Sequence, residues 1–132
     1  MIAVDLAQRL RDAGLPWSPA AGDRFVVPDR DLDDEVFVVS DMVVEVHQRP
    51  SGQVLGFNGT TEWALDSIET DTVVWLPREQ QLRVLLGRQF RALEAQPHGF
   101  VVVIERDGAE QQFVDVDAEQ AYARALLAVL ES

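Results

Sequence analysis

The chain has 132 residues and a formal net charge of −12, and all eleven of its basic residues are arginine. The absence of lysine and cysteine excludes Schiff-base chemistry, a phosphate-loop lysine, thiolate catalysis and cysteine-bound metals. The negative charge argues against direct binding to nucleic acid or to an anionic membrane, so we expect neither partner. We also expect no cofactor.

The first half of the chain predicts one helix followed by four strands. Ile2, Leu6 and Leu10 recur at helical spacing before a glycine, which indicates an amphipathic helix over 3–13. A Pro-Ser-Gly turn later favours the pairing of two neighbouring strands. Short runs of β-branched and aromatic residues predict the four strands at 24–27, 36–39, 42–47 and 53–57.

The middle of the chain predicts a strand between two helices. A threonine at 60 or 61 is placed to cap a helix over 61–68, and a strand follows at 72–76. The next helix starts at Pro77, because proline is tolerated in a first helical turn. Its apolar stripe consists of Leu82, Leu85, Leu86, Phe90 and Leu93. Gly87 costs about 1 kcal/mol relative to alanine, so the alternative is a helix that kinks or breaks there.

The last third of the chain predicts a β-hairpin and a closing helix. Asp107-Gly108 is the strongest hairpin signal in the sequence, between a strand over 100–106 and one over 109–114. Asp117 and Gln120 have the spacing of a capping box at the start of the helix. The buried face of that helix is expected to consist of Ala118, Ala121, Tyr122, Ala125, Leu126 and Val129.

These elements follow one another in the order α-β-β-β-β-α-β-α-β-β-α. Short turns between strands favour a mostly antiparallel sheet with helices packed on it, which is an α+β fold. The sequence contains no repeat, linker or composition boundary, so we expect a single domain over 1–132.

Two groups of acidic residues are candidates for metal or acid–base chemistry. The run from Asp29 to Glu35 lacks the glycine and the final glutamate of a calcium loop, so we expect a solvated connector rather than a metal site. Glu62, Asp66 and Glu69 have the spacing of one helical face and are candidates for acid–base or metal chemistry. The alternative is a face that is exposed or balanced by arginine.

A basic segment follows Pro77, where four arginines and one glutamate give a local charge of +3. Arginine binds carboxylate and phosphate with two parallel hydrogen bonds, so one hypothesis is a recognition surface. The alternative is an internal role, in which these arginines face the acidic helix predicted over 61–68 and the acidic loop from Asp29 to Glu35. Trp63 lies beside the N-terminus of the helix predicted over 61–68, where backbone amides favour the binding of anions. The candidate interaction surface therefore comprises Trp63, Arg78, Arg83 and Arg88.

Three stretches and the last helix together resemble a family of small, acidic actinobacterial proteins that often carry a pilus-assembly label. The stretches are Asp-Arg-Phe-Val-Val-Pro-Asp at 23–29, Gly-Phe-Asn-Gly-Thr-Thr-Glu-Trp-Ala-Leu-Asp at 56–66 and Trp-Leu-Pro-Arg-Glu-Gln-Gln-Leu at 75–82, and the helix covers 118–130. The resemblance covers nearly the whole chain and implies a bacterial, intracellular domain. An ATPase-like site, to which the pilus label refers, needs a glycine-rich loop ending in lysine. This chain has neither, so no functional residue is carried over.

The leading hypothesis is a non-catalytic cytoplasmic module that binds a protein or a small anionic ligand, without assigned catalytic, cofactor or metal residues. One alternative is a small metal-dependent hydrolase that uses Glu62 and Asp66. Another is an acidic decoy that presents carboxylates in place of nucleic-acid phosphates. A further hypothesis is a homodimer that forms through a strand edge or through the last helix.

Overall fold

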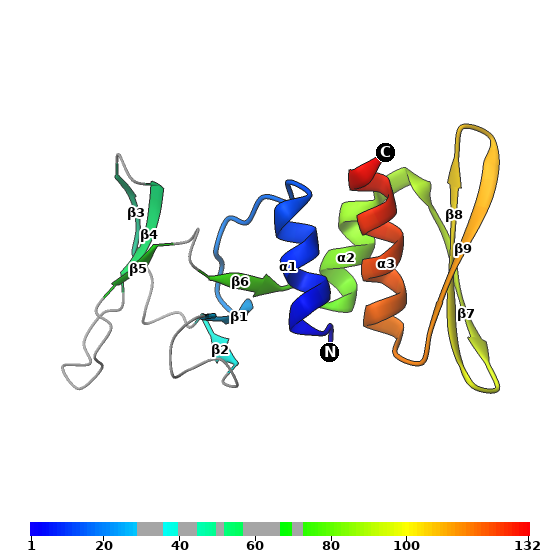
Figure 1. Ribbon diagram of the computed structural model, residues 1–132, viewed down its shortest axis with the longest axis horizontal. Coiled ribbons are helices and arrows are strands. Elements are labelled where there is room, and N and C mark those ends of the chain that lie inside the picture. Colours follow the sequence, from blue (N-terminus) through cyan, green and yellow to red (C-terminus); the bar gives the residue numbers. More distant parts are fainter. Residues whose placement is uncertain (29–35, 40–44, 50–51, 57–66, 70–72) are drawn as a thin grey trace. The chain divides into compact units, whose positions relative to one another are not determined.

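The computed structural model describes residues 1–28, 36–39, 45–49, 52–56, 67–69 and 73–132 (Figure 1). The chain divides into two compact units. The first unit combines Met1–Pro16 with Pro77–Ser132, and the second is Trp17–Leu76. Helices and antiparallel sheets are both present, which confirms the predicted α+β class.

The first unit is a three-stranded antiparallel sheet with its helices on one face (Figure 1). The strands follow one another in space as they do in the sequence, in the order β7-β8-β9. The elements are α1 (Val4–Asp12), α2 (Glu79–Leu86), a 3₁₀ turn η2 (Gly87–Gln89), β7 (Phe90–Gln96), β8 (Gly99–Arg106), β9 (Ala109–Asp115) and α3 (Ala118–Glu131).

Helix α3 is the centre of this unit, because it is buried on nearly all sides. Six of seven consecutive residues from 121 to 127 are buried, and only Arg124 is exposed. The helix packs against β8 and β9 and also against α1 and α2. The other helices contribute Leu6 and Leu10 from α1 and Leu82 and Leu86 from α2 to the same core. The predicted buried face is confirmed at Ala121, Tyr122, Ala125 and Leu126, whereas Ala118 and Val129 are only partly buried.

The β8–β9 hairpin confirms the turn signal in the sequence. Arg106 and Ala109 are paired across a two-residue connection, so Asp107 and Gly108 form the turn alone. Both have positive φ angles, 53° for Asp107 and 80° for Gly108. This is the conformation that favours Asp-Gly in tight hairpin turns.

The second unit contains two three-stranded antiparallel sheets. The sheet β2-β1-β6 is formed by β1 (Arg24–Val26), β2 (Phe37–Val38) and β6 (Val74–Leu76). The sheet β3-β4-β5 is formed by β3 (Glu45–Arg49), β4 (Gly52–Gly56) and β5 (Ser67–Glu69). The predicted strands at 24–27, 36–39, 42–47, 53–57 and 72–76 correspond to β1, β2, β3, β4 and β6.

An aromatic cluster lies beside the first of these sheets. The Trp17 ring stacks on Trp75 with centroids 6.2 Å apart, and Phe25 lies 5.8 Å from Trp17 and 5.5 Å from Phe37. Trp17 also donates its indole N–H to the buried carboxylate of Asp23 at 2.9 Å. Trp17 and Trp75 thus serve in packing within this unit.

Two predicted helices differ from the structure. The helix over 61–68 is wrong at its end, because Ser67–Glu69 is strand β5 paired with β4, and 61–66 lie outside the described residues. The helix after Pro77 ends at Leu86, because Gly87 takes a φ of 59°. The predicted break is therefore correct, and Phe90 and Leu93 belong to β7 rather than to a helical stripe. Pro77 precedes the N-cap residue of α2 instead of lying in its first turn.

Gly99 is the glycine at which a side chain would collide with the chain. A Cβ atom there would lie 2.5 Å from the backbone oxygen of Asp115, whereas one at Gly108 would meet nothing within 4 Å. We predict that Gly99→Ala lowers the free energy of unfolding by about 2 kcal/mol or more, since β8 and β9 must separate locally. The control Gly108→Ala should cost only about 1 kcal/mol, from its positive φ alone. Urea unfolding measures both, and equal losses would contradict this account.

Candidate functional site

The structure places three of the four candidate interaction residues on or beside α2. Arg78 is the N-cap of this helix, Arg83 lies within it and Arg88 lies in η2, and all three are exposed. Trp63 lies outside the described residues, as do Glu62 and Asp66. The acidic run Asp29 to Glu35 is outside them as well, so these predictions stay predictions.

Arg83 rests on an aromatic column. Its guanidinium carbon lies 4.6 Å from the centroid of Phe90, and Phe90 in turn stacks on Tyr122 at 5.6 Å. A guanidinium over an aromatic face is stabilised by the ring's quadrupole, and it keeps its outer hydrogen-bond donors. The position of Arg83 is therefore set by its packing on the Phe90 ring.

Arg91 has an internal role, although its acidic partner lies on β8 and not in the predicted acidic helix or loop. Its Nε donates to Glu105 Oε2 at 2.9 Å, and its Nη1 donates to the carbonyl oxygen of Arg88 at 2.6 Å. Arg91 thus joins β7 to β8 and holds the η2 turn in place. The charge of Arg91 is therefore paired with Glu105, whereas Arg83 and Arg88 form no salt bridge within the described residues.

Two exposed apolar residues lie between these arginines and were missed by the sequence analysis. Val84 is 72% exposed and Leu85 is 40% exposed. The sequence assigned Leu85 to the buried stripe of the helix, which is wrong, because α2 turns only Leu82 and Leu86 into the core. We call Arg83, Val84, Leu85 and Arg88 the α2 surface. It combines apolar side chains with positive charge in a strongly acidic chain.

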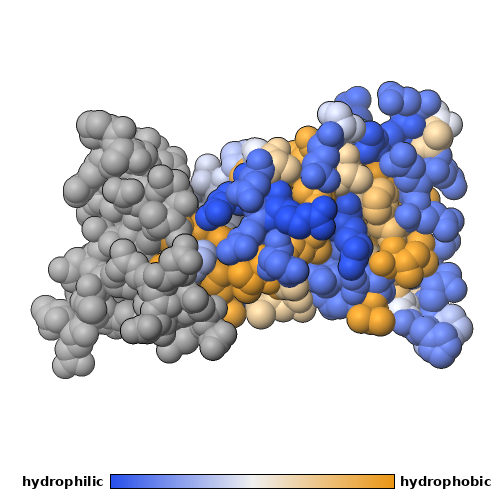
Figure 2. Space-filling view, in the orientation of Figure 1, coloured by the Kyte–Doolittle hydropathy of each residue, from blue (hydrophilic) through white to orange (hydrophobic). Residues whose placement is uncertain are grey.

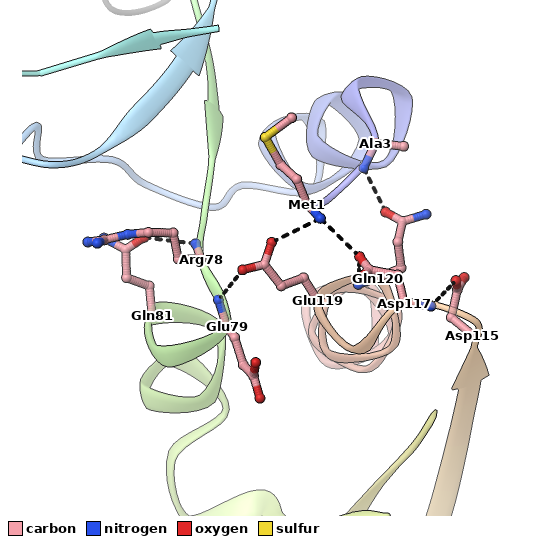
Figure 3. A network of polar contacts seen from close by, with 9 residues as sticks. All are labelled: Met1, Ala3, Arg78, Glu79, Gln81, Asp115, Asp117, Glu119 and Gln120. Atoms are coloured by element: carbon pink, nitrogen blue, oxygen red, sulfur yellow. Dashed lines mark hydrogen bonds and ion pairs between the residues drawn. The ribbon is translucent and has the colours of Figure 1, made fainter. Parts of the chain in front are cut away.

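A polar network ties together the starts of the three helices (Figure 3). The N-terminal ammonium of Met1 lies 3.3 Å from Asp117 Oδ2 and 3.5 Å from Glu119 Oε1. The other carboxylate oxygen of Glu119 accepts from the backbone N–H of Glu79 at 2.9 Å. These carboxylates therefore anchor helix starts and are occupied in holding α1 and α2 against α3.

The capping box predicted at α3 is only half formed. Asp117 accepts from the backbone N–H of Gln120 at 3.3 Å, as predicted. The side chain of Gln120 instead accepts from the backbone N–H of Ala3 at 2.7 Å (Figure 3). The backbone N–H of Asp117 donates to Asp115 Oδ1 at 3.1 Å. A partner more than a hundred residues away has replaced the local one.

Asp115 and Tyr122 have shifted pKa values, and both shifts have structural causes. Burial raises the pKa of Asp115, but backbone amides and the Arg124 guanidinium, 2.8 Å away, outweigh it and lower the pKa below its ordinary value of 3.8. Burial, and then the negative charge of Glu79, raise the pKa of Tyr122 above 10.0, against the opposing effect of Arg83.

The described part of the chain holds no group of three or more His, Cys, Asp or Glu side chains arranged to bind a metal ion. None of the helices found there has the length and apolar character needed to cross a bilayer. Comparison with protein-family models, with curated proteins and with solved structures finds no match for this chain.

Asp115 is predicted to stabilise the fold through its ionised form. Since its pKa is lowered on folding, its contribution is complete above the unfolded pKa and is lost as the pH falls through the folded value. Asp115→Asn should therefore lower the free energy of unfolding at pH 7 by about 2 kcal/mol. The variant should also lose less stability than the wild type between pH 5 and pH 2. Asp107→Asn makes the same charge change in an exposed turn and should be nearly neutral in urea titrations.

Tyr122 is the only tyrosine, and the chain lacks lysine and cysteine, so its ionisation is isolated in alkaline titrations. We predict a midpoint above 10 in the folded protein and near 10 in urea, followed by absorbance at 295 nm. Because folding raises this pKa, Tyr122 contributes stability below the unfolded pKa, and that contribution disappears as the pH rises through the folded value. A folded midpoint at or below the unfolded one would refute this.

Proposed function

We propose that the chain is a non-catalytic, cytoplasmic interaction module that contacts an acidic segment of a partner protein through the α2 surface. The observation that carries this proposal is the exposure of Val84, 72%, next to Arg83 and Arg88 in a chain of net charge −12. Within the described residues Arg83 and Arg88 form no salt bridge, and an exposed apolar side chain beside such charges favours a partner that offers carboxylates around an apolar anchor.

The chemistry of the surface supports protein recognition over catalysis. Arginine is enriched in interfaces because its planar fork binds carboxylates and its stem covers apolar area. Arg83 is already positioned over Phe90, so little conformational freedom is lost when it meets a partner. Val84 is more exposed than Leu85, the other exposed apolar residue of α2, so it supplies most of the apolar area that a partner could cover.

A second candidate, the acidic decoy, is favoured by the distribution of charge. The unit Trp17–Leu76 contains 12 acidic residues and 3 arginines and therefore carries −9 of the total charge of −12. A decoy of nucleic acid would bind a basic partner through this unit, and its affinity would fall steeply with salt. A small metal-dependent hydrolase that uses Glu62 and Asp66 remains an alternative from the sequence, without support from the described residues.

The α2 surface is tested by affinity capture from an actinobacterial lysate with immobilised wild-type chain and three variants. Val84→Asp and Arg88→Gln should each reduce capture of a stoichiometric partner at least tenfold, because they remove the apolar anchor and one cation. Arg9→Gln removes an exposed arginine on α1 and should leave capture unchanged.

The variants also separate the two candidate functions. A partner that is captured equally by all of them but is lost at high salt would support the decoy and contradict the α2 surface. Substitution of Arg83 is less informative, because its packing on Phe90 couples binding to stability.

A further inference from the structure

Strand β9 is an edge strand with an open side. Within the part of the chain that the structure describes, β9 pairs only with β8, at one end of the sheet β7-β8-β9. It is seven residues long, and its register with β8 runs without interruption from Ala109 to Asp115. The opposite edge strand, β7, has a register shift between Phe90 and Ala92. The more regular of the two edges is therefore β9.

The hydrogen-bonding groups on this open side follow from the turn. In a two-residue hairpin the pair that closes the turn, here Arg106 and Ala109, is hydrogen-bonded, and antiparallel pairs then alternate. The amide and carbonyl groups of Glu110, Gln112 and Val114 therefore point away from β8. All three residues are exposed. They offer a row of backbone groups to an added strand.

The sequence of β9 lacks most of the features that normally protect an edge. Edge strands are usually blunted by charged side chains, above all lysine, by proline or by a bulge, and Glu110 is the one charged residue among the three that point outward. β9 contains no lysine and no proline, and its middle consists of Gln111 and Gln112. Apolar side chains near its end are exposed, 61% at Val114 and 78% at Val116. Such an edge favours association with another strand.

We propose that β9 pairs antiparallel with β9 of a second copy of this chain, about a two-fold axis at Gln112. The three outward-pointing residues are centred on Gln112, so this register satisfies all of them at once. Glu110 then lies opposite the partner's Val114, and Gln112 lies opposite the partner's Gln112. The two sheets join into one antiparallel sheet of six strands, which keeps the helices of each copy on one face.

The register about Gln112 is compatible with a second copy of this acidic chain, because it sets no carboxylate of β9 directly opposite another. Glu110 faces an exposed valine, which packs against the carboxylate's apolar stem. Asp115 faces the partner's Ala109 and is already paired with Arg124 in its own chain. Like charges directly opposite each other destabilise a strand pair. In a chain of net charge −12, a register that avoids such pairs is therefore required for dimer formation. Among the three outward-pointing residues, Glu110 is the one carboxylate that a basic strand from another protein would meet directly.

The absence of cysteine makes the register measurable with single engineered thiols. In the proposed dimer the Cα atoms of the two copies of residue 112 lie about 5.5 Å apart, within disulfide range. The two copies of residue 116 lie about 27 Å apart, since eight residues separate them at about 3.4 Å each. Under mild oxidation Gln112→Cys should form a disulfide-linked dimer at least tenfold faster than Val116→Cys. Both thiols are on exposed positions, so the comparison is matched.

Sedimentation equilibrium of the unmodified chain gives an independent readout. We expect a monomer–dimer equilibrium in the micromolar range, because an edge-to-edge contact is a small interface. Gln112→Glu places two carboxylates at the axis and should weaken the dimer at least tenfold, with circular dichroism confirming that the variant is folded. A monomer at 100 μM, or equal rates of disulfide formation at 112 and 116, would overturn the proposal. Since the α2 surface is not involved, its variants should leave the dimer intact.

Discussion

The burial of α3 is the constraint on which the rest of the first unit depends. A helix that is apolar on nearly all sides needs partners in several directions, and α3 obtains them from β8 and β9 and from α1 and α2. Ala121, Ala123 and Ala125 keep the helix thin, so its neighbours approach its backbone closely. Removing any of these elements would expose part of the same core.

The position of α2 against this core explains the character of its outer surface. Only Leu82 and Leu86 are needed for packing, which leaves Arg83, Val84 and Leu85 to solvent. The polar network at the helix starts fixes α2 through the backbone of Glu79, so the exposed residues are held on a positioned element. The proposed binding surface therefore lies on an ordered helix, in contrast to a loop that must first be ordered.

The sequence predicted the elements whose signals are local. Helix α1, helix α3 and the Asp-Gly hairpin depend on periodicity and turn chemistry within a few residues, and all three are confirmed. Helix α2 breaks at Gly87, which was the alternative prediction, whereas the apolar stripe through Phe90 and Leu93 was wrong because these residues belong to strand β7. The end of the predicted helix over 61–68 was wrong because β5 is formed by pairing with β4, which no local signal encodes.

The candidate site shows the same division between local and long-range information. Arg83 and Arg88, named as candidate interaction residues, are exposed, and their proposed role stays a prediction. Val84 was overlooked, because the exposure of one valine depends on which side chains of α2 pack into the core. The bond between Gln120 and Ala3 joins residues separated by 117 positions, so the sequence showed only its local alternative, the capping box. Most of the acidic side chains considered as metal ligands lie outside the described residues.

The discontinuity of the first unit has a consequence for how the chain folds as it is made. Its first sixteen residues belong with its last fifty-six, and Trp17–Leu76 lies between them in the sequence. At a synthesis rate of about 5–20 residues per second, roughly 6–20 seconds pass between the synthesis of α1 and that of α3. During that interval the apolar side of α1, with Leu6 and Leu10, has no native partner and is open to a chaperone. The unit Trp17–Leu76 is fully synthesised before α3, so it can fold before the first unit does. The order of the units along the chain therefore sets the order in which they can fold.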